Sequence, residues 1–253
     1  MRVVLVPVLE DNYAYLLIDE ASKQAAAVDP AEPQKILAAA ESENVKLTHI
    51  LTTHKHWDHA GGNVEMAKLV PGIVVVGGAT EGVDACTKPM KGGESLHLGT
   101  VHIRCLDTPF HTLGHLSYFA EDAGQTAVFT GDSLFVGGCG RFFEGDPKQA
   151  HTSLIEVLGS LPPDTKVYCG HEYTVKNLTF AVTAEPGNPA VQAKLDWAKQ
   201  QVSKGLPTVP STIAEELAYN PFLRVDSPEI QRWCNCIAPI DVLAQVRRRK
   251  DCF

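Results

Sequence analysis

Short runs of aliphatic residues, broken every few positions by Gly, Asp and Pro, dominate the first two-thirds of the chain. Runs of this length, rich in β-branched residues and bounded by turn formers, are typical of strands in a largely buried sheet. We expect strands at residues 3–6, 13–18, 26–28, 49–52, 73–76, 101–106, 117–120, 127–130 and 166–169. Amphipathic helical patterns lie between them, at residues 32–43, 63–70 and 147–159. Strands interleaved with helices predict a layered α/β domain.

The pattern changes after about residue 172, where we expect no further strand. Asn188 precedes a proline, and Thr212 precedes a glutamate by three positions; both are typical helix starts. The helical patterns of this region cover residues 190–203, 213–219, 227–236 and 240–250. We therefore expect two domains, an α/β domain over residues 1–172 and a helical domain over residues 173–253.

Composition narrows the class of protein. A chain of 253 residues with 44% hydrophobic and 21% charged positions can bury a large core without disulfides, which excludes intrinsic disorder. The 22 basic and 30 acidic residues give a net charge of −8, which argues against a nucleic-acid partner. No apolar run approaches the roughly 18 residues of a membrane-spanning helix. The seven scattered cysteines form no disulfide framework, so we expect a reducing compartment, with the cytoplasm as the default. Separately, we expect a monomer.

The clearest chemical signal is the segment Thr53-His54-Lys55-His56-Trp57-Asp58-His59. It follows an expected strand, and a loop there can turn several side chains towards one point. His54 and His56 can reach one metal from an extended segment, whereas Asp58 and His59 suit a second. Imidazole and carboxylate are donors that zinc, manganese and iron accept. The alternative is a solvated loop with three histidines by chance, which is rare in a chain with ten histidines.

Three further candidate ligands, His111, Asp132 and His171, each follow an expected strand. Loops at strand ends often carry sites because a rigid scaffold positions them. Taken singly, each has an ordinary structural interpretation: a histidine after a strand is more often a hydrogen-bonded structural residue, and Asp132 could form a turn. Together with the histidine-rich segment they complete a set of seven possible metal ligands.

The pattern His54-x-His56-x-Asp58-His59, followed by His111, Asp132 and His171, resembles that of the metallo-β-lactamase superfamily. Over essentially its whole length, the chain also resembles the hydroxyacylglutathione hydrolase, or glyoxalase II, family within it. The segments that carry this closer resemblance are residues 53–63, 129–144, 169–177, 207–224 and 246–251. The resemblance implies an αββα sandwich of two mixed sheets, followed by a helical, glutathione-binding domain.

The resemblance also implies a binuclear metal site and a reaction. The ligand set maps onto two groups of three and one bridging residue: His54, His56 and His111; Asp58, His59 and His171; and Asp132. The implied cofactors are two divalent metal ions, zinc in the first place, with iron or manganese as alternatives. A metal-bridging hydroxide, held beside the catalytic carboxylates Asp58 and Asp132, would convert S-D-lactoylglutathione to D-lactate and glutathione.

A glutathione thioester carries two carboxylates, so an acidic protein must bind it at a locally positive site. The resemblance maps substrate contacts onto Arg141, Phe142, Phe143, His171, Tyr173, Arg247 and Lys250. Arg247 and Lys250 are three positions apart and share a helix face, although a basic helix end can also simply face water. The family commonly has Lys and Tyr where Arg141 and Phe143 stand, which changes the expected hydrogen bonding to the peptide.

Three functions remain open on the sequence. The first is a thioester hydrolase, and the second is a persulfide dioxygenase or a lactonase on the same fold. The third is a non-catalytic relative that keeps its metals. The complete second ligand group argues against the dioxygenase, which uses one iron, and lactonases lack this helical tail. The intact ligand set and basic tail argue against the non-catalytic relative.

Overall fold

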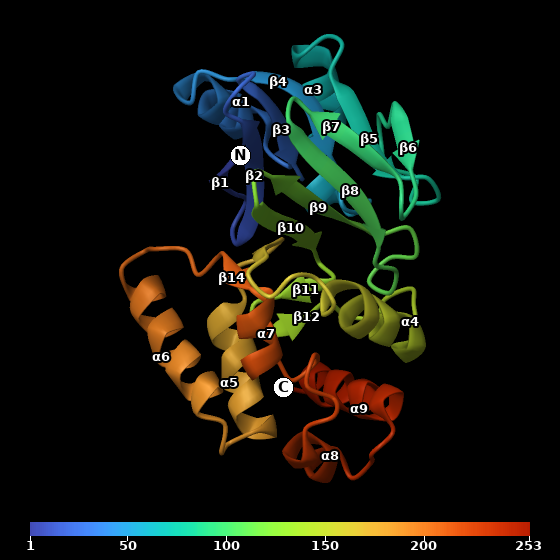
Figure 1. The fold of residues 1–253 in the computed structure, drawn as a ribbon, viewed down its shortest axis with the longest axis vertical. Helices are drawn as coiled ribbons and strands as arrows, with labels where there is room; N and C mark the ends of the chain where they lie inside the picture. The colour runs from blue at the N-terminus through green and yellow to red at the C-terminus, as the bar shows by residue number, and fades with distance from the viewer.

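The first two-thirds of the chain forms most of two six-stranded sheets (Figure 1). The computed structural model describes all residues from 1 to 253. The strands of the first sheet, in spatial order, are β1 (Arg2–Val8), β2 (Asn12–Asp19), β3 (Gln24–Val28), β4 (Lys46–Leu51), β5 (Val74–Gly78) and β6 (Lys88–Met90). The pairs β1–β2 and β2–β3 are antiparallel, and the remaining pairs are parallel.

The second sheet includes a strand from far along the chain. Its strands, in spatial order, are β14 (Ser211–Thr212), β13 (Lys166–Cys169), β10 (Gln125–Gly131), β9 (Leu116–Asp122), β8 (Val101–Asp107) and β7 (Ser95–Leu98). All pairs are antiparallel except β10–β13. A separate hairpin joins β11 (Leu134–Phe135) to β12 (Gly138–Cys139).

The main core lies between the two sheets. Tyr15 and Leu17 of β2 meet Ile103 of β8 and Phe129 of β10 in one buried cluster. Every residue of β2 is buried, as expected for a strand that is covered on both faces. The outer face of the first sheet packs against α1 (Pro33–Ser42) and α3 (Asn63–Leu69) in a second cluster. The order of helix, sheet, sheet and helix confirms the expected αββα sandwich.

Helices cover the outer face of the second sheet and form the lower part of Figure 1. The helix α4 (Pro147–His151) continues into a π-helical segment, η1 (Thr152–Leu158). The helices of the C-terminal region are α5 (Thr174–Ala184), α6 (Pro189–Ser203), α7 (Ile213–Tyr219), α8 (Pro228–Cys234) and α9 (Pro239–Asp251). None of the helices combines the length and the apolar character that crossing a membrane requires.

Both expected helix starts of the C-terminal region are confirmed. The Asn188 side chain accepts a hydrogen bond from the Ala190 backbone at the start of α6. At the start of α7, Thr212 and Glu215 form a reciprocal capping box, in which each side chain bonds the other residue's backbone N–H. These local signals are reliable because they satisfy backbone groups that a helix end would otherwise leave unpaired.

The expectation of no strand after residue 172 is wrong, because β14 pairs with β13 through Lys166↔Thr212 and Val167↔Ser211. Two residues are too few for a strand periodicity to show in the sequence. The expected single helix 147–159 is also corrected, because the chain changes to π-helical geometry at Thr152.

Candidate metal centre and substrate pocket

Segments that leave strands of both sheets bring the seven expected ligands together. His54 and His56 follow β4, and the short helix α2 (Trp57–Ala60) carries Asp58 and His59. The other three ligands, His111, Asp132 and His171, follow β8, β10 and β13. Within this cluster, three overlapping groups have ligand atoms that all lie within 4.8 Å of one another: His54, His56 and His111; His54, His59 and Asp132; and Asp58, His59 and His171.

The first group is a set of three imidazoles with converging nitrogens. His56 Nδ1 lies 3.0 Å from His54 Nε2 and 3.1 Å from His111 Nε2. Burial lowers the pKa of His54 well below its ordinary value, and burial also lowers the pKa of His111. Neutral imidazole is the form that binds metal ions, so burial prepares these two side chains as ligands.

The second group consists of Asp58, His59 and His171. His171 Nε2 lies 3.3 Å from His59 Nε2 and 3.5 Å from Asp58 Oδ2. Two of its members therefore present nitrogens to the same point, with the Asp58 carboxylate beside them. This is the donor mixture of histidine and carboxylate that zinc, iron and manganese accept.

Asp132 lies between the two groups. Its Oδ1 is 3.3 Å from His59 Nε2, and its Oδ2 is 3.4 Å from His111 Nε2 and 3.5 Å from His171 Nε2. Asp132 Oδ1 is also buried without a hydrogen-bond partner. A buried carboxylate oxygen without a donor is costly, and a cation beside it would remove that cost. The position and the unpartnered oxygen both fit a carboxylate that bridges two metal ions.

The carboxylates of the cluster also favour positive charge beside them. Burial alone would raise the pKa of Asp132, but attraction to His59 and a hydrogen bond with His171 hold that pKa well below its usual range. Burial likewise opposes protonation of His171, yet hydrogen bonds to Asp132 and Asp58 raise its pKa to about 10. Without metal, protons are the cations that the carboxylates attract. Divalent ions would displace these protons, because a histidine ligand must be neutral.

Two carboxylates orient the rings of His59 and His171 by accepting hydrogen bonds from the ring nitrogens that face away from the proposed metal site. His59 Nδ1 donates to Asp29 Oδ2 at 3.0 Å, and His171 Nδ1 donates to Asp11 Oδ1 at 2.9 Å. Such bonds select the tautomer whose Nε2 is free to bind metal. No sequence signal points to Asp11 or Asp29, because only the pairing of distant strands brings them behind these rings.

Two aromatic side chains flank the metal ligands. The ring of Phe143 lies 5.1 Å from that of His111 and is 60% exposed. On the other side, Tyr173 stacks on His171 with 4.6 Å between ring centroids. Each of the two ligand groups therefore has an aromatic side chain packed against one of its histidines.

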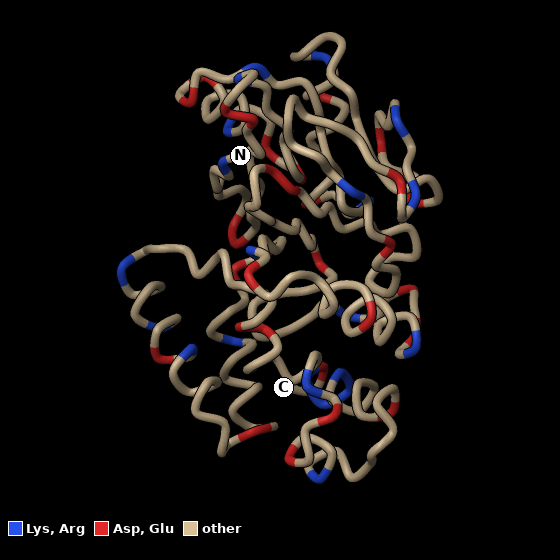
Figure 2. Tube along the Cα trace, viewed as in Figure 1, with Lys and Arg blue, Asp and Glu red and all other residues tan.

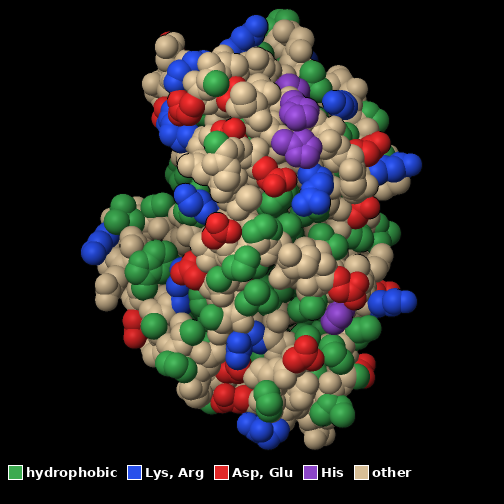
Figure 3. Space-filling view, in the orientation of Figure 1, with side chains coloured by type: hydrophobic (Ala, Val, Ile, Leu, Met, Phe, Trp, Pro, Cys, Tyr) green, Lys and Arg blue, Asp and Glu red, His purple; other side chains and the backbone are tan.

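A cavity of about 460 Å³ opens beside Phe143, between the segment after β12 and the end of α9. Arg141, Phe142, Phe143 and Arg247 line it, as do Arg248 and Asp251. Basic residues gather at this end of α9 (Figure 2), and in the same orientation the surface of the helical region is a mixture of hydrophobic and charged side chains (Figure 3). The cavity therefore combines apolar walls with positive charge, close to the metal ligands.

Three of the expected substrate-binding cations have different surroundings. Arg141 is exposed, and its Nε lies 3.6 Å from Asp251 Oδ1. Arg247 is buried and makes hydrogen bonds within the protein. Lys250 lies outside the cavity lining and donates to the Lys176 carbonyl at 3.2 Å. Burial, followed by repulsion from Arg247, lowers the pKa of Lys250 to about 8.

Two family profiles match the chain. The profile described as metallo-beta-lactamase superfamily matches residues 8–100, and the one described as hydroxyacylglutathione hydrolase C-terminus matches residues 172–253. An Arabidopsis thaliana protein named "Hydroxyacylglutathione hydrolase cytoplasmic" is 53% identical over 99% of this chain and 98% of its own length. The chain belongs to the hydroxyacylglutathione hydrolase family. A family member from Methylococcus capsulatus is 45% identical over 100% of this chain and 99% of its own length.

Solved structures confirm the fold of this family member. ETHE1 from Myxococcus xanthus superimposes with a TM-score of 0.68 at 29% identity, over 100% of this chain and 99% of its own. TTHA1623, solved in a di-iron-bound form, has a TM-score of 0.62 at 25% identity, over 88% of this chain and 100% of its own. The chain is therefore a thioester hydrolase of the metallo-β-lactamase superfamily, with histidine and aspartate clusters for divalent metals.

Proposed function

We propose that this hydroxyacylglutathione hydrolase converts S-D-lactoylglutathione to D-lactate and glutathione at a binuclear metal centre. The observation that carries the proposal is the convergence of seven buried or half-buried ligands beside a cationic cavity. The proposed metal ligands are His54, His56, Asp58, His59, His111, Asp132 and His171. The persulfide dioxygenase, the lactonase and the non-catalytic relative are not favoured, since relatives at 45–53% identity bear the hydrolase name.

Two divalent metal ions fit the residues present. Each histidine group would offer converging nitrogens to one ion, and the Asp132 carboxylate reaches both groups, with Oδ2 near His111 and the unpartnered Oδ1 near His59. When bound, such ions supply Lewis acidity and a water whose pKa falls to about 7. We propose zinc as the first occupant, with iron or manganese as alternatives, because the donor set accepts all three.

The chain's own residues place the substrate and keep the reacting carboxylates ionised. Asp58 and Asp132 both have a pKa below the usual range despite burial, so both are negative at neutral pH. Asn12 Nδ2 donates to Asp58 Oδ2 at 3.0 Å and fixes that carboxylate beside the ligands. Because the leaving group is a thiolate, it needs less help from a proton donor than an amine does.

We propose that the glutathione portion lies in the cavity beside Phe143. The residues proposed to contact substrate are Arg141, Phe142, Phe143, His171, Tyr173, Arg247 and Lys250. The exposed guanidinium of Arg141 can turn from Asp251 to a peptide carboxylate, with which it forms a planar, two-bond pair. Phe143 has no hydroxyl, so its side chain contributes contact area only.

A comparison of two thioesters tests the assignment to glutathione. The chain should hydrolyse S-D-lactoylglutathione with a much higher kcat/KM than the S-D-lactoyl thioester of N-acetylcysteine, which lacks the two terminal residues of the peptide. Equal kcat/KM values for the two thioesters would show that the cavity does not recognise glutathione, and would leave a general thioesterase.

We also propose that residues 1–172 form the metal-binding unit and residues 173–253 the glutathione-binding unit. The profile match at residues 172–253 and the place of Arg247 in the cavity lining support that division. We further propose that the chain acts as a cytoplasmic monomer. The name of the Arabidopsis relative and the free state of all seven cysteines support a reducing compartment.

A further inference from the structure

Arg247 has surroundings that a residue serving only to bind substrate would not need. It is only 6% exposed. Its Nη1 donates to the carbonyl of Cys139 at 2.9 Å and to that of Gly140 at 3.4 Å. Its Nη2 lies 2.9 Å from Asp251 Oδ1. Both Nη atoms are therefore bound within the protein, and Nη1 binds the carbonyls of the last residue of β12 and of the glycine that follows it, whereas Nε is buried without a partner.

The backbone that Arg247 binds is in direct contact with the metal ligands. A Cβ atom on Gly140 would lie 2.0 Å from the Asp132 carbonyl oxygen and 2.9 Å from His111 Nδ1, so only glycine fits there. The next carbonyl, that of Arg141, accepts a hydrogen bond from His111 Nδ1 at 3.0 Å. The segment 139–141 is therefore held between Arg247 on one side and two metal ligands on the other.

We propose that Arg247 is a positioning residue for the metal ligand His111. By holding the carbonyls of Cys139 and Gly140, it fixes the Arg141 carbonyl against which the His111 ring is oriented. A fixed acceptor at Nδ1 keeps the proton there and leaves Nε2 free for metal. The inference rests on the proposed ligand set, and it gives Arg247 an effect on metal affinity in addition to any contact with substrate.

Electrostatic repulsion alone predicts the opposite effect of Arg247 on metal affinity, which makes the inference testable. A guanidinium near the metal centre repels divalent cations, so its removal alone would strengthen metal binding. If Arg247 positions His111, its removal must instead weaken metal binding. The direction of the change in metal affinity therefore distinguishes a positioning residue from a charge that acts only on substrate.

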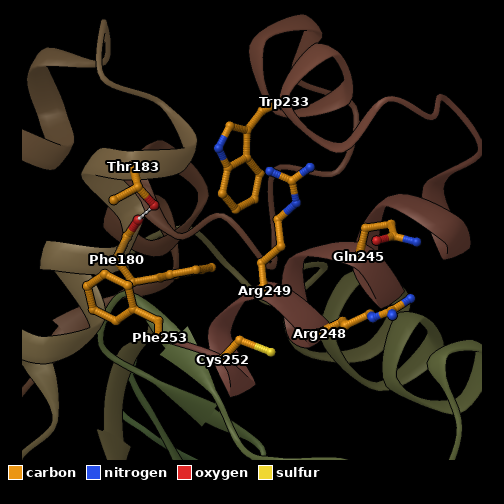
Figure 4. Close-up of a pocket in the computed structure, with 8 residues that line it drawn as sticks. All are labelled: Phe180, Thr183, Trp233, Gln245, Arg248, Arg249, Cys252 and Phe253. Carbon is orange, nitrogen blue, oxygen red and sulfur yellow. Dashed lines mark hydrogen bonds between the residues drawn. The ribbon is translucent and has the colours of Figure 1, made fainter.

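The test is competition with a chromophoric chelator for metal bound to the purified protein. Arg247→Ala should release the first metal at a chelator concentration roughly threefold to tenfold lower than wild type needs, somewhat less than the loss of a direct bond to a ligating histidine produces. Arg249→Ala is the matched control: Arg249 lies on the same helix and covers the Trp233 ring at 4.2 Å, facing a separate cavity (Figure 4). It should release metal as wild type does.

A second variant keeps the test decisive if Arg247→Ala fails to fold. Arg247→Lys retains the charge but cannot present two donors in a planar fork, so its metal should also be released earlier. Adding free guanidinium should restore metal retention in Arg247→Ala and leave Arg249→Ala unchanged. Metal release equal to or later than that of Arg249→Ala in both Arg247 variants would overturn the inference.

Failure of the inference can be told apart from failure of the proposed function. A wild-type protein that binds no divalent metal would overturn the ligand assignment and the inference with it. A wild type that holds two metals, with Arg247 variants that hold them equally well, would overturn the inference alone. Because the readout is metal retention, it does not depend on which thioester the enzyme hydrolyses.

Discussion

Ring orientation in the metal centre depends on residues that the ligand pattern does not contain. The convergence of these seven residues could be predicted because three histidines and one aspartate lie within a single short segment, and the others follow apolar strands. Asp11, Asp29 and the Arg141 carbonyl could not be predicted as their partners. A carboxylate or carbonyl behind a histidine has no sequence signature, since its place is set by strand pairing.

Asp132 is the residue on which the binuclear assignment depends most. Asp132→Ala removes the only carboxylate near both histidine groups, so metal content and turnover should fall together, with turnover reduced by at least about 100-fold. Metal analysis and steady-state rates on the same sample check this. Asp107 lies at the end of β8 but outside the cluster, so Asp107→Ala is the matched control and should retain both its metal content and its turnover. Two retained metals with near-normal rates in Asp132→Ala would rule out the bridging role.

The lowered pKa of Lys250 predicts that substrate binding depends on pH. Its pKa of about 8 lies below the ordinary lysine value, so the ammonium is present below pH 8 and is lost as the pH rises through that value. KM for the peptide with its two carboxylates should therefore rise above pH 8, by roughly twofold to fivefold for a partly exposed charge pair. Lys250→Arg stays charged throughout and should abolish the rise. A flat KM in wild type, or an unchanged rise in Lys250→Arg, would remove Lys250 from the binding site.

At the scale of elements, apolar strands that lead into a turn and helices with a capping residue could be predicted, whereas very short strands and helices with a mixed apolar pattern could not. The strand β13 was predicted at its full length because four consecutive residues lead into a glycine turn. The helix α5 was missed because Asn177 is buried while Val175 and Val182 are only partly buried, so the apolar residues do not follow the buried face and the helical period is blurred. The strand β14 is too short to show any period.

Glu216 connects three of these elements through a buried carboxylate. It accepts hydrogen bonds from the hydroxyls of Ser211 and Tyr219, the Gly137 backbone and the Asn220 amide. Burial raises its pKa above the ordinary value. The network ties β14 and α7 to the turn of the β11–β12 hairpin, which leads to the segment behind His111.

Removing the Glu216 carboxylate should affect the stability of the fold rather than the catalytic reaction. Glu216→Ala leaves buried donors without an acceptor and should lower the free energy of unfolding by about 1–3 kcal/mol, measured by urea denaturation. Glu156→Ala, which removes an exposed carboxylate, should change it by less than about 0.5 kcal/mol. Equal stability of the two variants would show that the Glu216 network contributes nothing to the junction.

For the molecule as a whole, the helical region shares its core with the second sheet. Phe119 and Val128 of that sheet lie in one buried cluster with residues of the C-terminal region: Phe180 of α5, Phe222 of the turn after α7 and Val246 of α9. The change in sequence pattern near residue 172 therefore marks a difference in composition, not a gap between two separate cores. Sequence alone shows where strands give way to helices, but it does not show which apolar faces meet.

The shared core predicts that residues 1–172 do not form a stable unit alone. That fragment lacks β14 and the five C-terminal helices, so it exposes the outer apolar face of the second sheet. We expect it to aggregate or to bind a hydrophobic dye strongly, without a cooperative thermal transition. The intact chain under the same conditions is the control. A soluble fragment that unfolds cooperatively would contradict the shared core.

The most direct test is turnover of S-D-lactoylglutathione by the purified 253-residue chain, with divalent metal counted in the same sample. We predict rapid hydrolysis at about two metal ions per chain, loss of activity on chelation and recovery when metal is restored. Two bound metals without hydrolysis would contradict the proposed substrate, and undiminished hydrolysis after both metals are removed would contradict the proposed metal centre.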